Sequence, residues 1–238
     1  MTSSIRRALL VAVAGLATFA SAAAVTDGAL RLTAKVGDVR KYKLTAAVKF
    51  QDQDLAVTGG VNVKVMRVDD AGLITVQVTA TSTQAKGGDQ PIPVQDSPAL
   101  VEVFKPDGTL SELRGENASQ TAYRLETLTS VKLPAFPLEK DKTWTWEIFP
   151  NPKVGIQKAT IDYKVLGEET VAGIATWKVS RAIKETEGDS PATGDGTVWI
   201  NKRDGTLVKQ VDVWKNAPIP NAQSPVDGTF TLELQPPA

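Results

Sequence analysis

Histidine and cysteine, two residues central to enzyme and metal chemistry, are absent from the 238-residue chain. Their absence excludes Ser-His-Asp and Cys-His nucleophilic sites, His-ligated zinc or iron, and thiolate or iron–sulfur centres. The chain also lacks a Walker loop, a dinucleotide fingerprint, an S-x-x-K motif and a G-x-S-x-G motif. Carboxylate-pair chemistry and calcium binding survive these exclusions. We therefore predict a non-enzymatic protein with no catalytic residue and no cofactor.

Carboxylate chemistry has two places to occur. Glu147, beside Trp146, is where a carboxylate-based hydrolase would be sought, but strand alternation places it on the wetted face. The loop EGDSPATGDG at 187–196 holds Glu187, Asp189 and Asp195, whose oxygens could bind calcium, although the spacing does not match an EF-hand. In both places a solvated carboxylate is the favoured interpretation, so no metal site is predicted.

The stretch LPAFPLEKDKTWTWE at 133–147 sets two tryptophans one residue apart. The favoured interpretation is that Trp144 and Trp146 anchor the core, because burying an indole removes a large apolar area from water. The alternative is an aromatic-lined concavity that binds an apolar molecule such as a lipid. All five tryptophans lie in the second part of the chain. The predicted ligand-binding residues are Trp144, Trp146, Trp177, Phe136 and Tyr42.

Alternation of apolar and polar residues runs through almost the whole chain. In YKLTAAVKF at 42–50, for example, every second residue from Tyr42 is apolar. This period of two is typical of antiparallel strands with one buried and one wetted face. Asp-Gly turns at 107–108 and 204–205 separate such runs. The pattern predicts about eleven strands, near 39–50, 55–68, 73–83, 100–104, 109–113, 143–149, 156–166, 173–183, 196–201, 206–215 and 226–234.

One segment has helical spacing, NASQTAYRLETLTS at 117–130, with Asn117 as the predicted N-cap. It ends before Pro134 and Pro137, which cannot continue a helix. A helix of about three turns cannot cover the apolar face of eleven strands. We therefore predict an all-β antiparallel meander that curls into a half-barrel or folds into a sandwich, with one short helix at its centre.

The chain repeats itself at an interval of about 100 residues. KPDGTL at 105–110 matches KRDGTL at 202–207, and GDQP at 88–91 matches GDSP at 188–191. KVGDVRKYKL at 35–44 loosely matches the region of 138–148. Three matches in the same order indicate a tandem duplication, with chance recurrence of hairpin residues as the alternative. The predicted organisation is a first β repeat at 25–130, ending in the helix, and a second at 131–238, in one continuous sheet or a closely packed pair.

Residues 1–24 have the pattern of a secretory signal peptide: Arg6 and Arg7, an apolar run, then small residues. Sec and twin-arginine export both remain open. No cysteine follows the apolar run, so we expect a periplasmic or extracellular protein without a lipid anchor. Removing the signal leaves 25 basic and 27 acidic residues. This near-neutral balance argues against nucleic acid as a partner, and no later segment is long and apolar enough to span a membrane. The oligomeric state stays open.

The phrase at 133–147 resembles one found in uncharacterised secreted bacterial β-proteins, where leucine-proline, an aromatic-proline pair and a polar turn precede a tryptophan strand. Lys140 and Asp141 stand where that class usually has glycine. The strand count and central helix also resemble the half-barrel clamp of periplasmic lipoprotein carriers. These resemblances imply an exported, non-catalytic envelope protein that binds an apolar ligand. The alternatives are a structural surface module without a ligand and a carboxylate-based hydrolase.

Overall fold

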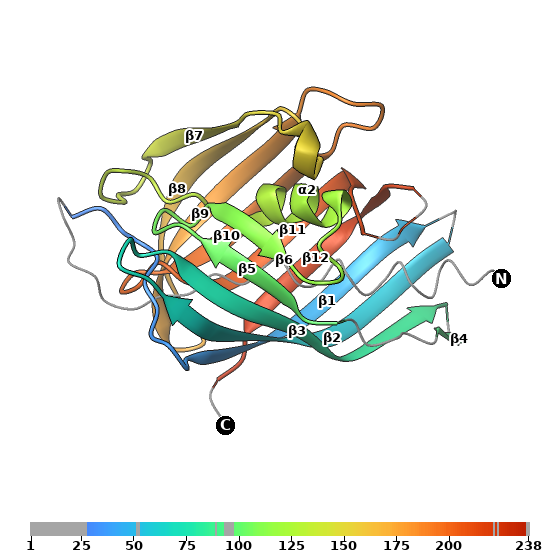
Figure 1. The fold of residues 1–238 in the computed structure, drawn as a ribbon, viewed down its shortest axis with the longest axis horizontal. Coiled ribbons are helices and arrows are strands. Elements are labelled where there is room, and N and C mark those ends of the chain that lie inside the picture. The colour runs from blue at the N-terminus through green and yellow to red at the C-terminus, as the bar shows by residue number, and fades with distance from the viewer. Residues whose placement is uncertain are drawn as a thin grey trace.

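A computed structural model describes residues 28–50, 53–88, 90–92, 98–220, 222 and 224–236. The predicted signal peptide lies outside the described residues. The described chain forms one antiparallel sheet of twelve strands (Figure 1). The strands are β1 (Val39–Phe50), β2 (Gln53–Val68), β3 (Ile74–Gly87), β4 (Gln90–Ile92), β5 (Leu100–Phe104), β6 (Leu110–Arg114), β7 (Thr143–Ile148), β8 (Ala159–Val171), β9 (Ile174–Glu185), β10 (Thr193–Asn201), β11 (Leu207–Ala217) and β12 (Val226–Leu234).

The sheet consists of two meanders joined through the first and last strands. Its order is β6-β5-β3-β2-β1-β12-β11-β10-β9-β8-β7, with β4 paired to β3. The central pairing of β1 with β12 brings Tyr42 opposite Leu234. We call β1–β6 the first half and β7–β12 the second half. The predicted all-β antiparallel class is confirmed, and a single continuous sheet replaces the sandwich alternative.

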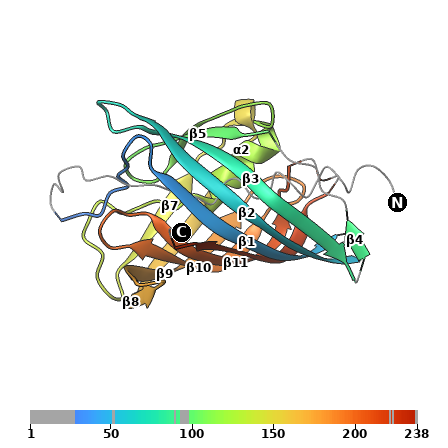
Figure 2. The same cartoon turned by 90° about the horizontal axis from the view of Figure 1, so that it is seen from below.

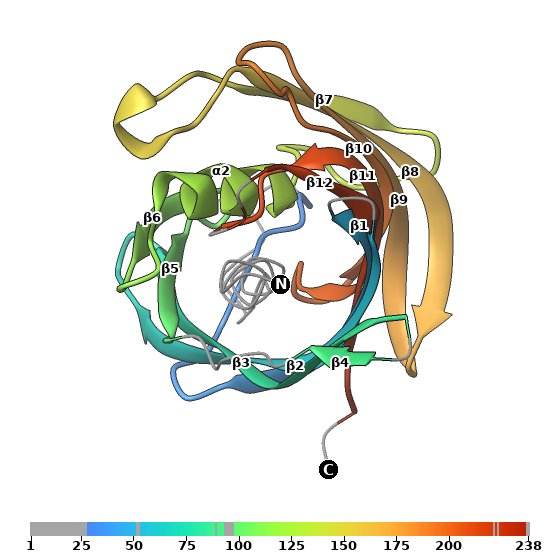
Figure 3. The ribbon, with the colours of Figure 1, turned by 90° about the vertical axis from the view of Figure 1, so that its right-hand side faces the viewer.

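The sheet curls strongly along its length (Figures 2 and 3). Burial alternates along the strands, as in β2, where Val61, Val63 and Val65 are fully buried and Lys64 is exposed. The alternate residues therefore line the concave face, and the polar residues between them cover the convex face. Strand β4 was not predicted, because a three-residue strand containing Pro91 is too short to show a period.

Helix α2 (Gln120–Thr129) lies inside the curl (Figure 3). The prediction that Asn117 is its N-cap was wrong. Ser119 is the N-cap, and its side chain accepts a hydrogen bond from the amide of Ala122. Asn117 instead donates through Nδ2 to the carbonyl of Pro98. The helix therefore begins two residues later than predicted, at a serine whose side-chain oxygen caps a free amide.

Two hairpins of matching sequence connect β5 to β6 and β10 to β11. In each, an aspartate accepts hydrogen bonds from the amide and the hydroxyl of the threonine two residues later, Asp107 with Thr109 and Asp204 with Thr206. We call residues 28–34 and 131–138 the lead-in segments, since they precede β1 and β7. Each crosses the hairpin of the other half: the amide of Thr33 donates to Asp204, and that of Leu133 to Asp107. The halves therefore hold each other reciprocally.

Candidate functional site

A buried ion pair anchors α2 to the second half. Arg181 on β9 and Asp212 on β11 are 2% and 1% exposed. The Arg181 guanidinium contacts both oxygens of Asp212, with Nε 3.0 Å from Oδ1, and Nη1 donates to the carbonyl of Thr129 at 2.8 Å. A cation at a helix C-terminus is favourable for the helix dipole. Gly196 lies between these strands without a side chain, because a Cβ there would overlap the Asp212 carboxylate.

A second ion pair holds the first turns of the helix. Arg124 on α2 donates to both oxygens of Glu185 on β9, at 2.8 and 2.5 Å, and to the carbonyl of Ser190. The amide of Ala192 also donates to Glu185. The Glu185 side chain is 1% exposed. Both ends of α2 are thus bound to the second half by charged, fully partnered groups.

Little space remains between α2 and the strands of the second half. The cavity there has a volume of about 10 Å³ and is lined by Leu125, Thr129, Asp212, Trp214, Ala217, Ile219 and Phe230. That volume holds about one water molecule. An organic ligand cannot lie between the helix and β11 or β12 without moving the helix.

The concave face of the first half has a different character. Its strands β2 and β3 lie across the axis of the curl from α2 (Figure 3). Apart from Arg40 at the start of β1, the Tyr42 hydroxyl and Thr83 on β3, the inward positions of β1–β3 are mainly apolar. They include Tyr42, Leu44, Ala46, Val48, Leu55, Val57, Val61, Val63, Val65, Ile74, Val76 and Val78. These side chains form an extended apolar surface on the concave side of the first half.

Two carboxyl groups meet where α2 approaches the first half. Glu102 on β5 and Glu126 on α2 are 0% and 1% exposed, and we call them the acid pair. All four of their carboxyl oxygens are buried without a hydrogen-bond partner among the described residues. Burial raises the pKa of Glu126 to about 8. Burial, and then the charge of Glu126, raise the pKa of Glu102 well above its usual value.

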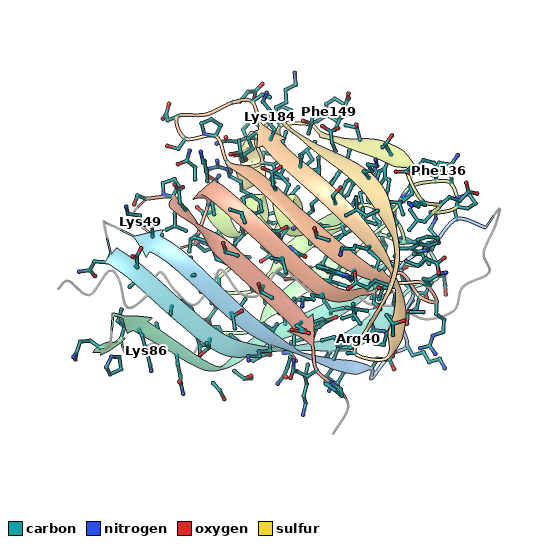
Figure 4. All side chains as sticks on the ribbon, turned by 180° about the vertical axis from the view of Figure 1, so that it is seen from behind. Arg40, Lys49, Lys86, Phe136, Phe149 and Lys184 are labelled. Carbon is teal, nitrogen blue, oxygen red and sulfur yellow. The ribbon has the colours of Figure 1, made fainter. Side chains whose placement is uncertain are left out.

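The structure brings together two of the predicted aromatic residues. Trp144 stacks on Tyr163 with ring centroids 4.7 Å apart, and Phe136 meets Trp144 edge-on at 6.3 Å. The indole Nε1 of Trp144 donates to the carbonyl of Lys132 at 2.9 Å. Figure 4 shows Phe136 near one end of β7 and Phe149 near the other. The ring and the donor of Trp144 are thus both engaged within the protein.

The other predicted aromatic residues lie apart from this cluster. The ammonium of Lys132 lies 5.7 Å from the ring centroid of Trp146, and that of Lys202 lies 4.5 Å from that of Trp177. Tyr42, on β1, donates its hydroxyl to the carbonyl of Leu207. Burial raises the pKa of Tyr42 to about 12, so this hydroxyl is a stable donor. No ring contact among the described residues joins these three side chains to one another or to Trp144.

The carboxylates considered from the sequence lie on the outside. Glu147 is exposed, on the opposite face of β7 from the indoles. The described residues contain no cluster of three or more potential metal ligands of the His, Cys, Asp or Glu types. A groove of about 510 Å³ on the outer face of β7–β10 is lined mainly by polar side chains, including Thr145, Asp162 and Lys164. Thr145 donates to Asp162 there at 2.5 Å.

Sequence reasoning missed the buried charges that organise the interior. The missed residues are Glu102, Glu126, Arg181, Glu185, Gln210 and Asp212. A signal was present in the strands: in LVEVF, the alternation that turns Leu100 and Phe104 inward turns Glu102 inward too. A charged residue at an inward position of an apolar strand must find a partner or change its protonation state.

No protein-family model matches this chain, and no curated protein matches it. Among solved structures, one similar chain is a lipovitellin studied for its lipid–protein interactions, with 11% identity and a TM-score of 0.44 over 90% of this chain. This chain spans 26% of that lipovitellin chain. In the described residues, no helix has the length and apolar character needed to span a membrane.

Two bacterial structures are also similar. One, from Bacteroides fragilis, has a YmcC-like fold and is assigned as exported, with 11% identity and a TM-score of 0.38 over 87% of this chain and 100% of its own. The other is a DUF1329 family protein from Desulfovibrio piger, with 14% identity and a TM-score of 0.22 over 84% of each chain. A bacterial protein assigned as exported and a DUF1329 family protein are thus among the matches.

Proposed function

We propose that this chain is an exported, non-catalytic protein that binds an apolar ligand, such as a lipid, against the concave face of its first half. One observation carries the proposal: the two halves share one curled sheet, but the buried ion pairs that hold α2 belong to the second half. The inward side chains of β1–β3 are mainly aliphatic, and Arg40 at the start of β1 pairs with Asp204 of the second half. A curved apolar surface of this kind suits a hydrocarbon chain.

The aromatic residues contribute in two ways under this proposal. Trp144 acts as an anchor, because Tyr163 and the carbonyl of Lys132 already occupy its ring and its donor. Trp146 on β7 and Trp177 on β9 are half-buried in the second half, outside the proposed apolar surface. Tyr42 lies within the proposed apolar surface itself.

Adjacent alanines on β1 provide a matched test. Ala46 faces inward and is 8% exposed, whereas Ala47 faces outward. The Ala46→Phe variant fills the concave face, and the Ala47→Phe variant adds the same group outside. We expect Ala46→Phe to weaken binding of a fluorescent long-chain fatty acid at least about tenfold, a loss of about 1.4 kcal/mol. Ala47→Phe should leave the dissociation constant nearly unchanged.

Folding is checked by the denaturation midpoint of each variant, because an added ring can overpack a core. If Ala46→Phe fails to fold, Ala85→Phe replaces it, since Ala85 is 3% exposed on β3. Equal effects of the inward and outward variants would contradict the proposal. So would wild-type protein that binds no probe and carries no lipid in native mass spectrometry after purification from its own host.

A structural surface module without a ligand is the second candidate. The closed packing around Trp144 and the one-water cavity beneath α2 favour it, because both are typical of a core with no vacant site. A carboxylate-based hydrolase has less support. Glu147 lies on the outer face, and the acid pair is enclosed where a substrate would not reach it.

A further inference from the structure

The acid pair has no evident structural purpose in the packing of α2. Its four oxygens lack partners in the described part of the chain, although both side chains are at least 99% buried. The strand neighbours of Glu102 are Val76 on β3 and Leu113 on β6, which are apolar. Each unpartnered buried polar group costs stability, so the pair weakens the contact that it occupies.

Two arginines, one on α2 and one on β9, pair with other carboxylates rather than with the acid pair. Arg124, on the same helix, is bound to Glu185, and Arg181 on β9 is bound to Asp212. Tyr123, also on α2, uses its hydroxyl to accept a hydrogen bond from the amide of Leu113 on β6 at 2.7 Å. The charge facing Glu102 across the contact is therefore that of Glu126, and two ionised carboxylates in an apolar site repel each other.

The helix is consequently attached to the two halves by different means. Its polar contacts with β9, from Arg124 to Glu185 and from Arg181 to the carbonyl of Thr129, are fully partnered and persist when carboxylates ionise. Its contact with β5 contains the acid pair, which is compatible with burial when the carboxyls are protonated. Ionisation of the pair therefore weakens one side of the helix and leaves the other side unchanged.

We propose that Glu102 and Glu126 form a proton-sensitive latch: protonated, they let α2 close against β5; ionised, they release that side of the helix and open the concave face. The latch regulates access to the apolar site and in that sense rests on the proposed function. The motion is a small separation of α2 from β5 and β6, in which the hydrogen bond between Tyr123 and Leu113 breaks. The Arg124–Glu185 ion pair and the hydrogen bond from Arg181 to the carbonyl of Thr129 keep the helix on the second half.

The absence of cysteine allows a direct test without any ligand. Ala122→Cys places a single thiol at a fully buried position of α2, and Ser111→Cys places one at an exposed position of β6. Thiol-labelling rates are measured from pH 6 to pH 9.5 in two backgrounds: the native acid pair and the double variant Glu102→Gln/Glu126→Gln. Glutamine has nearly the shape of protonated glutamate but cannot ionise. Dividing by the Ser111→Cys rate removes the pH dependence of the thiol itself.

We expect the normalised labelling rate of Ala122→Cys to rise with pH in the native background, approaching about tenfold per pH unit once one carboxyl titrates. In the glutamine background the normalised rate should stay flat. A flat rate in both backgrounds, or an equal rise in both, would overturn the latch. Leu128→Cys, at a second buried position of α2, serves if Ala122→Cys does not fold.

Binding of the fatty-acid probe is measured separately in the same two backgrounds. If labelling does not depend on pH but the probe still binds, the latch is rejected and the proposed function is retained. If the labelling rate rises with pH only in the native background and no probe binds, the proposed function is rejected. The latch is then retained as a movement of the helix alone. Binding that is slower in the glutamine background supports both together.

Discussion

The backbone of the first half and that of the second half follow the same design at several points, whereas their inner faces differ. Before β1, the amide of Gly37 donates to Val65 of β2, and before β7 the amide of Asp141 donates to Val165 of β8, both at 2.9 Å. Gly37 and Asp141 both have positive φ, 90° and 66°. These correspondences fit a tandem duplication, which stays a prediction of the sequence.

The inner faces show where the halves have diverged. On β1–β3 the inward side chains are almost all aliphatic, whereas β9 and β11 carry Arg181, Glu185, Gln210 and Asp212 at inward positions. The pairing register indicates that Val78 on β3 occupies the place that Arg181 has on β9. The difference teaches that one copy of a common scaffold can hold a helix through buried charges while the other keeps an apolar face.

The largest expected effect comes from removing the buried charge of Arg181, whose place in the first half is taken by Val78. Arg181→Met leaves Asp212 buried without its guanidinium, so we expect a loss of about 3–5 kcal/mol in the free energy of unfolding. Denaturant unfolding measures it. Lys164→Met is the control, because the Lys164–Asp141 pair is exposed and should contribute about 0–1 kcal/mol. If the two variants behave alike, the buried pair does not distinguish the halves.

The next effect concerns pH. The acid pair has folded-state pKa values above those of the unfolded chain, with Glu126 at about 8 against 4.5. Below pH 4.5 the carboxyls are protonated in both states, and the full stability is present. As pH rises toward 8 the unfolded chain releases these protons while the folded chain keeps them, so stability falls.

We expect a decrease of a few kcal/mol in the free energy of unfolding between pH 5 and pH 8.5. The double variant Glu102→Gln/Glu126→Gln should remove most of this slope, because burial raises the pKa of Glu102 even without Glu126. Glu139→Gln, at an exposed position, should leave it intact. Stability that rises over this range, or a slope that survives the double variant, would show that other groups dominate.

The smallest effect tests the reciprocal crossing of the lead-in segments. Gly108 and Gly205 have φ of 83° and 71°, and a Cβ at each would meet the carbonyl of Val131 or of Arg31, respectively. We expect each alanine variant to cost about 1–3 kcal/mol. Gly173→Ala is the control, since its φ is 78° but nothing lies within 4 Å of the added atom. Costs equal to that control would mean that the crossings contribute little.

Local features of this fold were accessible from the sequence. The bounds of β1, β5 and β12 were predicted to the residue, because alternation and flanking turns mark them. The pairing of β1 with β12 was not predicted, since their residues lie almost 190 positions apart along the chain. The acid pair was missed for a related reason: Glu102 is visible as an inward charge, but only the docked helix shows that Glu126 faces it.

The reciprocal crossing also constrains how the chain folds. Tyr42 donates to the carbonyl of Leu207, 165 residues later, and Thr33 donates to that of Asp204. A chain made from its N-terminus therefore completes the first half while β1 still lacks β12, so β1 is temporarily an open edge strand. Contacts between residues so far apart in the sequence slow folding. During that interval the β12 of a second molecule competes for the same edge, so domain-swapped dimers are the misfolded species expected when the protein refolds at high concentration.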